Sequence, residues 1–475
     1  SLFDMKDGIA DDILMTPGQP NILRGPNGFE WWLIYMANKN NEHRGQYINR
    51  VQFFDKTLFV DGITSPRTMG YHPEPSMPTF AGKGETASFG VLQQVQPSVA
   101  YLFETGVKTE GGAGVIAWWK DADNCAYVGL DAENRSWYLR TLVGGKENKE
   151  SYALPEDFRW GVYHHLRIER NGGCLKIWLD EIPAPGRHVF AEALPVEEAG
   201  VPGVFDETKS ALFEGATYTI GFDDVHFQLS GNEELLKGDF LNDYELSFQL
   251  SGLSGQDKAG SYPVYVDKDN YVKAQFDGIT RMLEVTAVKK GKTAWKKEFP
   301  LGCLQTLYPD VKYTDFIEKG YRFAAPAWLD TLYLNRHEAG NKSEFVDDMF
   351  GKFDIEYLNG GEWHPIENKD RGIAEHPAYN YCTFTPVKAE GIRFINKEAE
   401  DLERHIYKIG VHELWKESYN FRAVRRADKL YLFVDGRELG ALDIRYPASC
   451  IGFCSEGGSP VYSGTLYYHV GQRRD

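Results

Sequence analysis

Residues 164–182 have the sequence HHLRIERNGGCLKIWLDEI, in which apolar and polar residues alternate on both sides of Asn171-Gly172-Gly173. Alternation with a period of two places successive side chains on opposite faces of a β-strand. An Asn-Gly pair readily adopts the positive backbone angles of a tight hairpin turn. The segment therefore predicts a two-stranded hairpin with one buried face.

Strand patterns of the same kind continue on both sides of this hairpin, from about Ser88 to Leu229. Short alternating apolar runs are separated by Gly, Asn, Asp and Pro, which favour turns. Helical periodicity is hard to find outside Glu398–Arg404. The chain is therefore predicted to be all-β.

A second copy of this pattern begins near Lys237. Residues 419–436, YNFRAVRRADKLYLFVDG, repeat the hairpin, and Asp269-Asn270-Tyr271-Val272 repeats the pattern of residues 123–128. Tyr244–Leu250 matches the entry strand at Val99–Glu104. The two halves of the second copy are far apart in the sequence, which predicts an insertion into a surface loop, where the entropic cost is modest.

Composition limits the classes of partner. The chain has 475 residues, which indicates about three domains, and a net charge of −17 with scattered Lys and Arg. Nucleic acid and an anionic membrane surface are therefore disfavoured as partners, whereas a neutral polysaccharide fits better. No apolar run approaches the roughly 18 to 20 residues that a membrane-spanning helix needs.

Residues 17–62 contain an ordered series of motifs: PGQPN from Pro17, RGPNG from Arg24, WWLIY from Trp31, and an R-G-x-x-x-N-R-V strand from Arg44. The series ends in Asp61-Gly62-Ile63-Thr64. It resembles the closing blade of the five-bladed propeller in family 43 glycoside hydrolases, which the resemblance connects with arabinan and xylan. The resemblance implies that the other four blades, and with them the catalytic carboxylates, are absent from this chain.

Two residues of the blade are carried over as substrate-binding candidates. Arg44 matches a pocket-side arginine of the family, which can hydrogen-bond substrate or the catalytic carboxylate. Gln19 stands where the family has a histidine at the propeller axis, and an amide is a poorer metal ligand than imidazole. An arginine in a polar loop is also commonly just solvated, so both interpretations of Arg44 stay open. No catalytic residue is assigned to this chain.

The remainder resembles accessory β-sandwiches. The repeated hairpin is similar to that of concanavalin A-type jelly rolls, and residues 353–414 resemble the second half of a discoidin-like module. The predicted organisation is a closing blade with linker (1–84), a first sandwich (85–232), a second sandwich (233–314 plus 416–475) and a discoidin-like insert (315–415).

Exposed aromatic rings can stack on sugar rings, and Trp118, Trp137 and Trp328 are the candidates for this role. The competing interpretation places each of them in a sandwich core. The acidic pairs Asp223-Asp224 and Asp347-Asp348 could hold a structural calcium ion. The metal site is otherwise undetermined, and buried free thiols are expected for the six cysteines.

The preferred hypothesis is a part of a polysaccharide-degrading hydrolase, periplasmic or extracellular, whose sandwiches bind glycan or complete the substrate cleft. Its partners would be a plant-type polysaccharide and a companion chain that carries the other blades, since a lone blade exposes apolar faces and unpaired edges. Two alternatives remain: a stand-alone carbohydrate-binding protein and a β-sandwich adhesion or scaffold protein.

Overall fold

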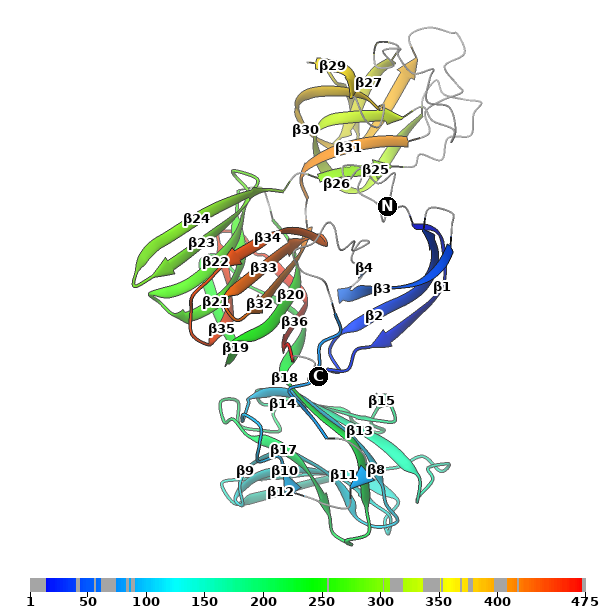
Figure 1. Cartoon of the computed structure of the whole chain (residues 1–475), viewed down its shortest axis with the longest axis vertical. Helices are drawn as coiled ribbons and strands as arrows, with labels where there is room; N and C mark the ends of the chain where they lie inside the picture. The colour runs from blue at the N-terminus through cyan, green and yellow to red at the C-terminus, as the bar shows by residue number, and fades with distance from the viewer. Residues whose placement is uncertain are drawn as a thin grey trace.

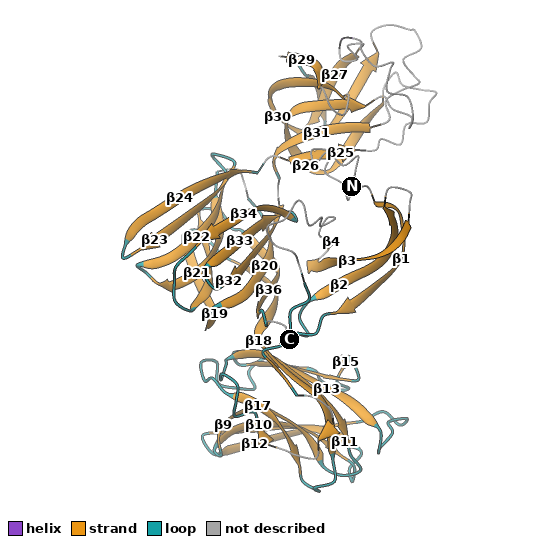
Figure 2. Cartoon of the chain, viewed as in Figure 1, coloured by secondary structure: helices purple, strands orange, loops and turns teal. Residues whose placement is uncertain are grey.

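The computed structural model describes most of the chain: residues 14–39, 43–54, 57–60, 74–82, 85–86, 90–253, 256–301, 303–307, 319–335, 351, 353–367, 370–374, 379–396, 408–416 and 418–471. All the long elements within these residues are β-strands arranged in sheets (Figure 2). The predicted all-β fold class with packed sandwiches is thereby confirmed. None of the described elements is a helix of the length and hydropathy that would cross a membrane.

The N-terminal sheet has four antiparallel strands, paired in chain order. They are β1 (Leu14–Arg24), β2 (Trp31–Lys39), β3 (His43–Phe54) and β4 (Thr57–Val60). Strand number and order agree with the predicted propeller blade, which stays a prediction. In Figure 1 this blue sheet lies beside the second sandwich and above the first.

The first sandwich packs a six-stranded sheet against part of a larger sheet. The six-stranded sheet contains, in spatial order, β12 (Lys146–Ala153), β11 (Ser136–Val143), β10 (Asn124–Asp131), β9 (Ala113–Asp121), β17 (Val201–Asp206) and β7 (Gly90–Val91). The facing strands are β15 (Ile182–Pro183), β14 (Cys174–Leu179), β13 (Tyr163–Asn171), β8 (Ala100–Lys108) and β18 (Leu212–Gln228), with β16 (Val189–Phe190), β5 (Phe80–Ala81) and β6 (Glu85–Thr86) at their margins.

The second sandwich has the same spatial order of strands. Its six-stranded sheet contains β24 (Lys292–Pro300), β23 (Met282–Lys289), β22 (Asn270–Asp277), β21 (Lys258–Asp267), β35 (Ser449–Glu456) and β19 (Glu233–Leu241). The facing strands are β34 (Arg437–Asp443), β33 (Lys429–Val434), β32 (Ser418–Arg426), β20 (Asp243–Ser251) and β36 (Val461–His469). The predicted hairpins are β13–β14 and β32–β33.

Buried details show that the two sandwiches are structural repeats. Both β9 and β21 shift register beside their neighbours, at Ala117 and Pro263, which is the mark of a β-bulge. The bulged carbonyl accepts a hydrogen bond from a buried tyrosine in each copy, Tyr101 at 2.5 Å and Tyr244 at 2.7 Å. The two sandwiches therefore share the β-bulge and its tyrosine hydrogen bond as well as the order of their strands.

Strand β18 joins the two sandwiches into one continuous sheet. Residues 212–220 of this strand pair with β8 of the first sandwich, and residues 221–228 pair with β36 of the second. The hydrophobic cores are likewise continuous, since one cluster of buried residues contains members of both copies, from Tyr101 to Tyr467. The first and second sandwiches share both a core and a sheet.

A separate seven-stranded sheet lies between β24 and β32 in the chain. It contains β25 (Cys303–Leu307), β31 (Lys408–Trp415), β26 (Lys319–Asn335), β30 (Tyr379–Asn396), β27 (Phe353–Asn359), β28 (Glu362–Pro365) and β29 (Asp370–Ala374). This sheet has its own core around Leu329, Phe353 and Ile392. The sheet includes β25, which begins at Cys303 and so precedes the predicted start of the insert at residue 315. The domain bounds and the discoidin-like character of the insert stay predictions.

A buried ion cluster fixes the N-terminal sheet to the second sandwich. Arg50 on β3 donates to Glu245 on β20 at 2.5 Å and to the Tyr468 hydroxyl at 2.8 Å. Its other nitrogen lies 3.5 Å from Glu30, and the side chains of Arg50, Glu30 and Glu245 are each at most 3% exposed. Hydrogen-bonded opposite charges are the arrangement that allows ions to be buried at an interface.

Candidate functional site: a polar cleft beside the N-terminal sheet

Charged side chains line the outer face of the first sandwich, on the β13–β14 hairpin. Ile168 lies in the core, so the alternation of β13 directs Arg167 and Glu169 to the opposite face. Trp178 and Lys176 of β14 are their cross-strand partners. The hairpin thus places a cation, an acid and an aromatic ring on one outer surface.

Arg167 is the centre of this surface. Its guanidinium lies 5.2 Å from the Trp178 ring centroid, is hydrogen-bonded to Glu169, and lies 3.9 Å from Glu104 of β8. The residue is 6% exposed, and its Nε has no hydrogen-bond acceptor among the described residues. Buried N–H donors normally have an acceptor, so the Nε of Arg167 is an unsatisfied donor beneath the outer surface.

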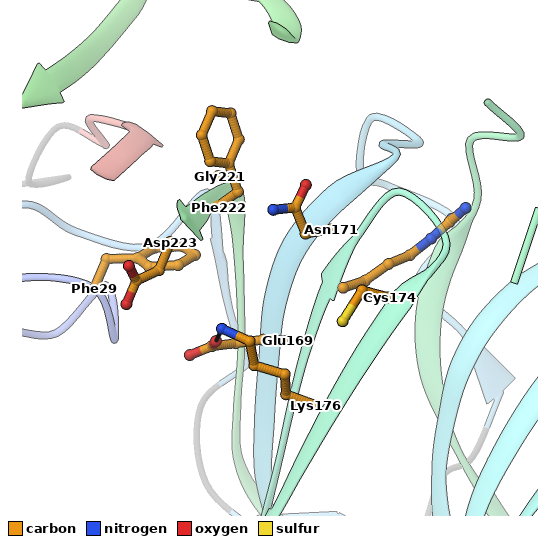
Figure 3. Close-up of a pocket in the computed structure, with 9 residues that line it drawn as sticks. Phe29, Glu169, Asn171, Cys174, Lys176, Gly221, Phe222 and Asp223 are labelled. Atoms are coloured by element: carbon orange, nitrogen blue, oxygen red, sulfur yellow. Dashed lines mark ion pairs between the residues drawn. The ribbon is translucent and has the colours of Figure 1, made fainter. Parts of the chain in front are cut away.

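A small pocket opens beside this surface, where the N-terminal sheet meets β13, β14 and β18 (Figure 3). Lys176 lies 3.7 Å from Glu169 within it, and Asp223 of β18 faces the same pocket. The full lining consists of Phe29, Glu169, Arg170, Asn171, Cys174, Lys176, Gly221, Phe222 and Asp223. We call the pocket and the adjoining Arg167 surface the polar cleft.

Asp223 differs electrostatically from the other acids of the cleft. Burial, and secondly the charge of Glu169, raises the pKa of Asp223 to about 6. Its neighbour Asp224 is instead paired, with Lys237 and with Asn171 at 2.6 Å. Around pH 5 the cleft therefore contains a carboxyl group that is mostly protonated and can donate a hydrogen bond.

The N-terminal sheet contributes the wall of the cleft through the turn between β1 and β2. Asn27 Oδ1 accepts hydrogen bonds from the backbone of Phe29 at 3.1 Å and Glu30 at 3.0 Å, which fixes the turn. Gly28 has φ of 77°, and a Cβ there would lie 2.9 Å from Leu102 of β8. Only glycine fits this close approach without strain, and it holds Phe29 against the first sandwich.

A second contact crosses the cleft at its edge. Arg24 of β1 donates to Glu181 at 2.9 Å, beyond the end of β14. Burial and the neighbouring Arg167 lower the pKa of Arg24. Acids, cations, an amide and two aromatic rings thus surround one opening, and this mixture of groups can bind a neutral ligand rich in hydroxyl groups.

The structure corrects two of the predicted stacking residues. Trp118 is fully buried beneath Arg170, and Trp137 is 2% exposed and stacks on Tyr152 with ring centroids 4.9 Å apart. The bulge at Ala117 changes the alternation of β9 and turns Trp118 into the core. The prediction that these two rings stack on sugar is therefore wrong, and the competing core interpretation holds for both.

The other predicted residues lie away from the cleft or have side chains outside the described part of the chain. Trp328 packs against the core shared by the sandwiches, and Arg281 covers one face of its ring at 4.0 Å. Gln19 is exposed on β1, with φ of 52°. Arg44 lies on β3 opposite Asn38, and its side chain is not among those described. The substrate-binding roles of Gln19 and Arg44 stay predictions.

The calcium prediction gains no support from the geometry. Asp347-Asp348 lies outside the described residues. Within the described part of the chain, no group of three or more His, Cys, Asp or Glu residues is arranged to hold a metal ion. The carboxylate of Asp224 already accepts hydrogen bonds from Lys237 and Asn171.

No protein-family model matches the chain, and no curated protein matches it in sequence. Similar solved structures include the carbohydrate-binding module CBM66 from Bacillus subtilis, at 14% identity and a TM-score of 0.21, covering 43% of this chain and 96% of that one. A second is the β-fructofuranosidase of Aspergillus kawachii, complexed with glycerol, at 10% identity and a TM-score of 0.27, covering 98% and 72%.

A third similar structure is the GH43 protein BlXynB from Bacillus licheniformis, at 12% identity and a TM-score of 0.23, covering 46% of this chain and 55% of that one. Identities and TM-scores this low transfer neither a residue role nor an activity to the present chain. Its function must therefore be inferred from the chemistry of the polar cleft.

Proposed function

We propose that this chain is part of a polysaccharide-degrading glycoside hydrolase of the periplasm or cell exterior, and that its polar cleft binds arabinan- or xylan-type chains. The observation that carries the proposal is the convergence of Arg167, Glu169, Lys176, Asp223 and Phe29 from three separate parts of the sequence. Sugar hydroxyl groups both donate and accept hydrogen bonds, and the cleft offers both kinds of partner.

The catalytic carboxylates of such an enzyme would come from outside this chain. Glycoside hydrolysis needs two carboxyl groups that flank the scissile bond. The sequence from residue 17 to 62 matches only a closing blade, so the blades that would carry those groups belong to a companion polypeptide or to a preceding part of the same one. The role of this chain is to bind and orient the polysaccharide.

The N-terminal sheet supports the existence of such a partner. Large apolar side chains are unusually exposed on it, namely Ile22 (42%), Leu23 (50%), Ile48 (42%), Phe53 (46%) and Leu58 (49%). Ile22 and Leu23 are adjacent in β1 and point to opposite faces. A sheet that is apolar on both faces is stable only when both faces are covered.

The binding part of the proposal is tested by isothermal titration calorimetry with arabino- and xylo-hexaose. At pH 7, Glu169→Gln and Asp223→Asn each remove a charge from the cleft while preserving shape, and each is expected to weaken binding about ten-fold. The matched control is Glu298→Gln, an exposed acid of the second sandwich paired with Lys296. Equal affinity of all three variants and the parent chain would contradict the cleft as the binding site.

A further inference from the structure

The turn between β14 and β15 lies at the edge of the polar cleft and has an unusual backbone. Asp180 and Glu181 have φ of 52° and 65°, between the paired residues Leu179 and Ile182, as in a two-residue hairpin turn. Aspartate accepts this left-handed conformation readily, whereas glutamate adopts it rarely. The Glu181 carboxylate accepts a hydrogen bond from Arg24 of the N-terminal sheet at 2.9 Å. The unfavourable residue is thus the one that reaches across the cleft.

His164 holds the first residue of this turn and uses both of its ring nitrogens. Its Nδ1 lies 2.7 Å from Asp180 Oδ2, and its Nε2 lies 2.6 Å from the Arg159 carbonyl oxygen. Neither an ionised carboxylate nor a carbonyl group can donate, so both contacts are hydrogen bonds only when both ring nitrogens carry a hydrogen. The Phe158 ring stacks on the imidazole with centroids 4.0 Å apart, an arrangement that attracts a cation. The geometry therefore fits the imidazolium form of His164.

His165 faces the second residue of the turn from the outer side of β13. Its Nδ1 lies 3.0 Å from Glu181 Oε1, and its Nε2 lies 3.7 Å from Glu104 Oε2 on β8. Both carboxylates attract the ring when it is charged. Two cations also face these acids, since Arg167 lies 3.9 Å from Glu104 and Arg24 donates to the other oxygen of Glu181. The Glu181 carboxylate is therefore shared between the N-terminal sheet and a histidine of the first sandwich.

The second sandwich has the same turn without the histidines. Asp435 and Gly436 follow β33 with φ of 51° and 75°, and Lys416 Nζ lies 3.2 Å from Asp435 Oδ2. Tyr419 and Asn420 stand at the positions of the two histidines. A lysine keeps its charge throughout the range, about pH 5 to 8, in which histidine loses it. The first copy thus has pH-sensitive cations where the second has a permanent one, and glutamate where the second has glycine.

We infer that His164 and His165 form a pH-sensitive latch, which in its charged form holds the Asp180–Glu181 turn against Arg24 and closes the edge of the polar cleft. When His164 loses a proton to water, one of its nitrogens faces an oxygen lone pair at 2.6 or 2.7 Å, and that contact becomes repulsive. The turn is therefore held under mildly acidic conditions and released as the pH rises toward 8. The inference rests on the proposed function and adds a regulation of the same cleft.

Hydrogen–deuterium exchange of the full chain, read by mass spectrometry at pH 5.5 and pH 8, tests the latch without a sugar. We expect the protection factors of residues 178–184 to fall about five-fold between these values, after correction for the intrinsic effect of pH on exchange. Those of the equivalent turn, residues 433–439, should stay within about two-fold.

Histidine variants identify the groups responsible. His164→Gln should lower the protection of residues 178–184 at pH 5.5 and remove its pH dependence, because the neutral amide cannot change its charge. His226→Gln, at an exposed histidine of β18, should behave like the parent chain. Asp223→Asn should keep the pH dependence of the turn, which separates the latch from the titration of the pocket.

Glu181→Gly extends the test to the cleft. It gives the first turn the Asp-Gly sequence of the second, which suits the backbone, but it removes the contacts with Arg24 and His165. Calorimetry with xylohexaose and arabinohexaose at the same two pH values measures the consequence. We expect this variant to bind about three-fold more weakly than the parent chain at pH 5.5, as for the loss of an ion pair open to water, and equally at pH 8.

The outcomes separate the latch from the proposed function. Protection of residues 178–184 that is the same at both pH values, or that keeps its pH dependence in His164→Gln, would overturn the latch and leave the cleft as a binding site. Equal affinity of Glu181→Gly and the parent chain at pH 5.5 would show that the turn does not act on the cleft, which also overturns the inference. Exchange that depends on pH in a chain that binds neither hexaose would support the histidine switch and contradict the proposed function together with its regulation.

Discussion

The two sandwiches have retained the same interior and acquired different exteriors. Arg170 and Arg425 occupy equivalent places in β13 and β32, each over a buried tyrosine, at 5.9 and 5.8 Å, and each donates to backbone carbonyls of the loop that follows. On the outer face, by contrast, Glu169 and Lys176 of the first copy correspond to Val424 and Tyr431 of the second. Packing constrains the residue types at the buried positions, whereas the outer positions can differ in residue type and so in function.

The outer face of the second copy is occupied by protein, whereas that of the first copy keeps a cleft. Glu245, on the strand equivalent to β8, bonds to Arg50 of the N-terminal sheet and is 3% exposed. The corresponding contact with the first copy is the Arg24–Glu181 pair, in which Glu181 is 57% exposed. Among the ion pairs of the N-terminal sheet, those with the second sandwich are therefore expected to contribute more to its attachment than the pair with the first.

The largest expected effect tests this difference in attachment. Arg50→Met leaves Glu30 and Glu245 buried without their cation, and we expect the free energy of unfolding to fall by about 3–5 kcal/mol. Arg24→Met removes a pair that is open to water and should cost less than about 1 kcal/mol. Denaturant titration of both variants measures the two values, and similar losses would contradict the asymmetry.

A smaller effect is expected in both copies. Tyr101→Phe and Tyr244→Phe each leave a bulge carbonyl without its buried hydroxyl donor, so each should lower the free energy of unfolding by about 1–3 kcal/mol. Chemical denaturation of the two single variants provides the comparison. Tyr244 also contacts the Ser449 hydroxyl at 2.7 Å, so a cost at Tyr101 that exceeds the one at Tyr244 would break the equivalence of the repeats.

The smallest effect is a pH dependence specific to the first copy. Burial raises the pKa of Asp223 from its ordinary value of 3.8 to about 6, so the folded state favours the protonated carboxyl. The stability that this group contributes is complete below pH 3.8 and is lost as the pH rises to about 6. Asp223→Asn should therefore gain roughly 1–2 kcal/mol over the parent chain between these limits.

Thermal unfolding of the parent chain and Asp223→Asn at pH 4 and pH 7 measures this gain. Asp224→Asn serves as the comparison, because its carboxylate is paired with Lys237 and should lose stability at pH 7 on neutralisation. A stability difference between the parent chain and Asp223→Asn that does not change with pH would refute the electrostatic description of the cleft.

The sequence was sufficient for the elements that depend on local patterns. Alternation and turn residues predicted both hairpins, and the second hairpin revealed the repeat with its interruption. The orientation of Trp118 could not be predicted in this way, because a bulge inverts the alternation of β9 and leaves no periodic pattern in the sequence. Pro263 lies at the equivalent bulge of the second sandwich. It was the available signal, since proline within a central strand commonly marks a bulge.

The polar cleft could not be predicted from the sequence for a different reason. Phe29, Glu169 and Asp223 are far apart in the chain. Phe29 and Glu169 taken alone look like ordinary loop or strand residues, and Asp223 was a candidate only as half of an acidic pair for calcium. They meet because the turn before β2 lies against β8 and because β18 continues past the first sandwich. Only the packing of the N-terminal sheet on both copies brings these side chains to one opening.

Strand β18 has a mechanical consequence. Its 17 residues run through both sandwiches with ladder hydrogen bonds on each side of the junction at Gly221, so no flexible linker separates the copies. Rotation of one copy against the other would break the hydrogen bonds of a continuous sheet. We therefore expect the two copies to move as one rigid unit. A polysaccharide bound by the first copy would therefore keep a fixed orientation relative to any molecule bound by the second copy.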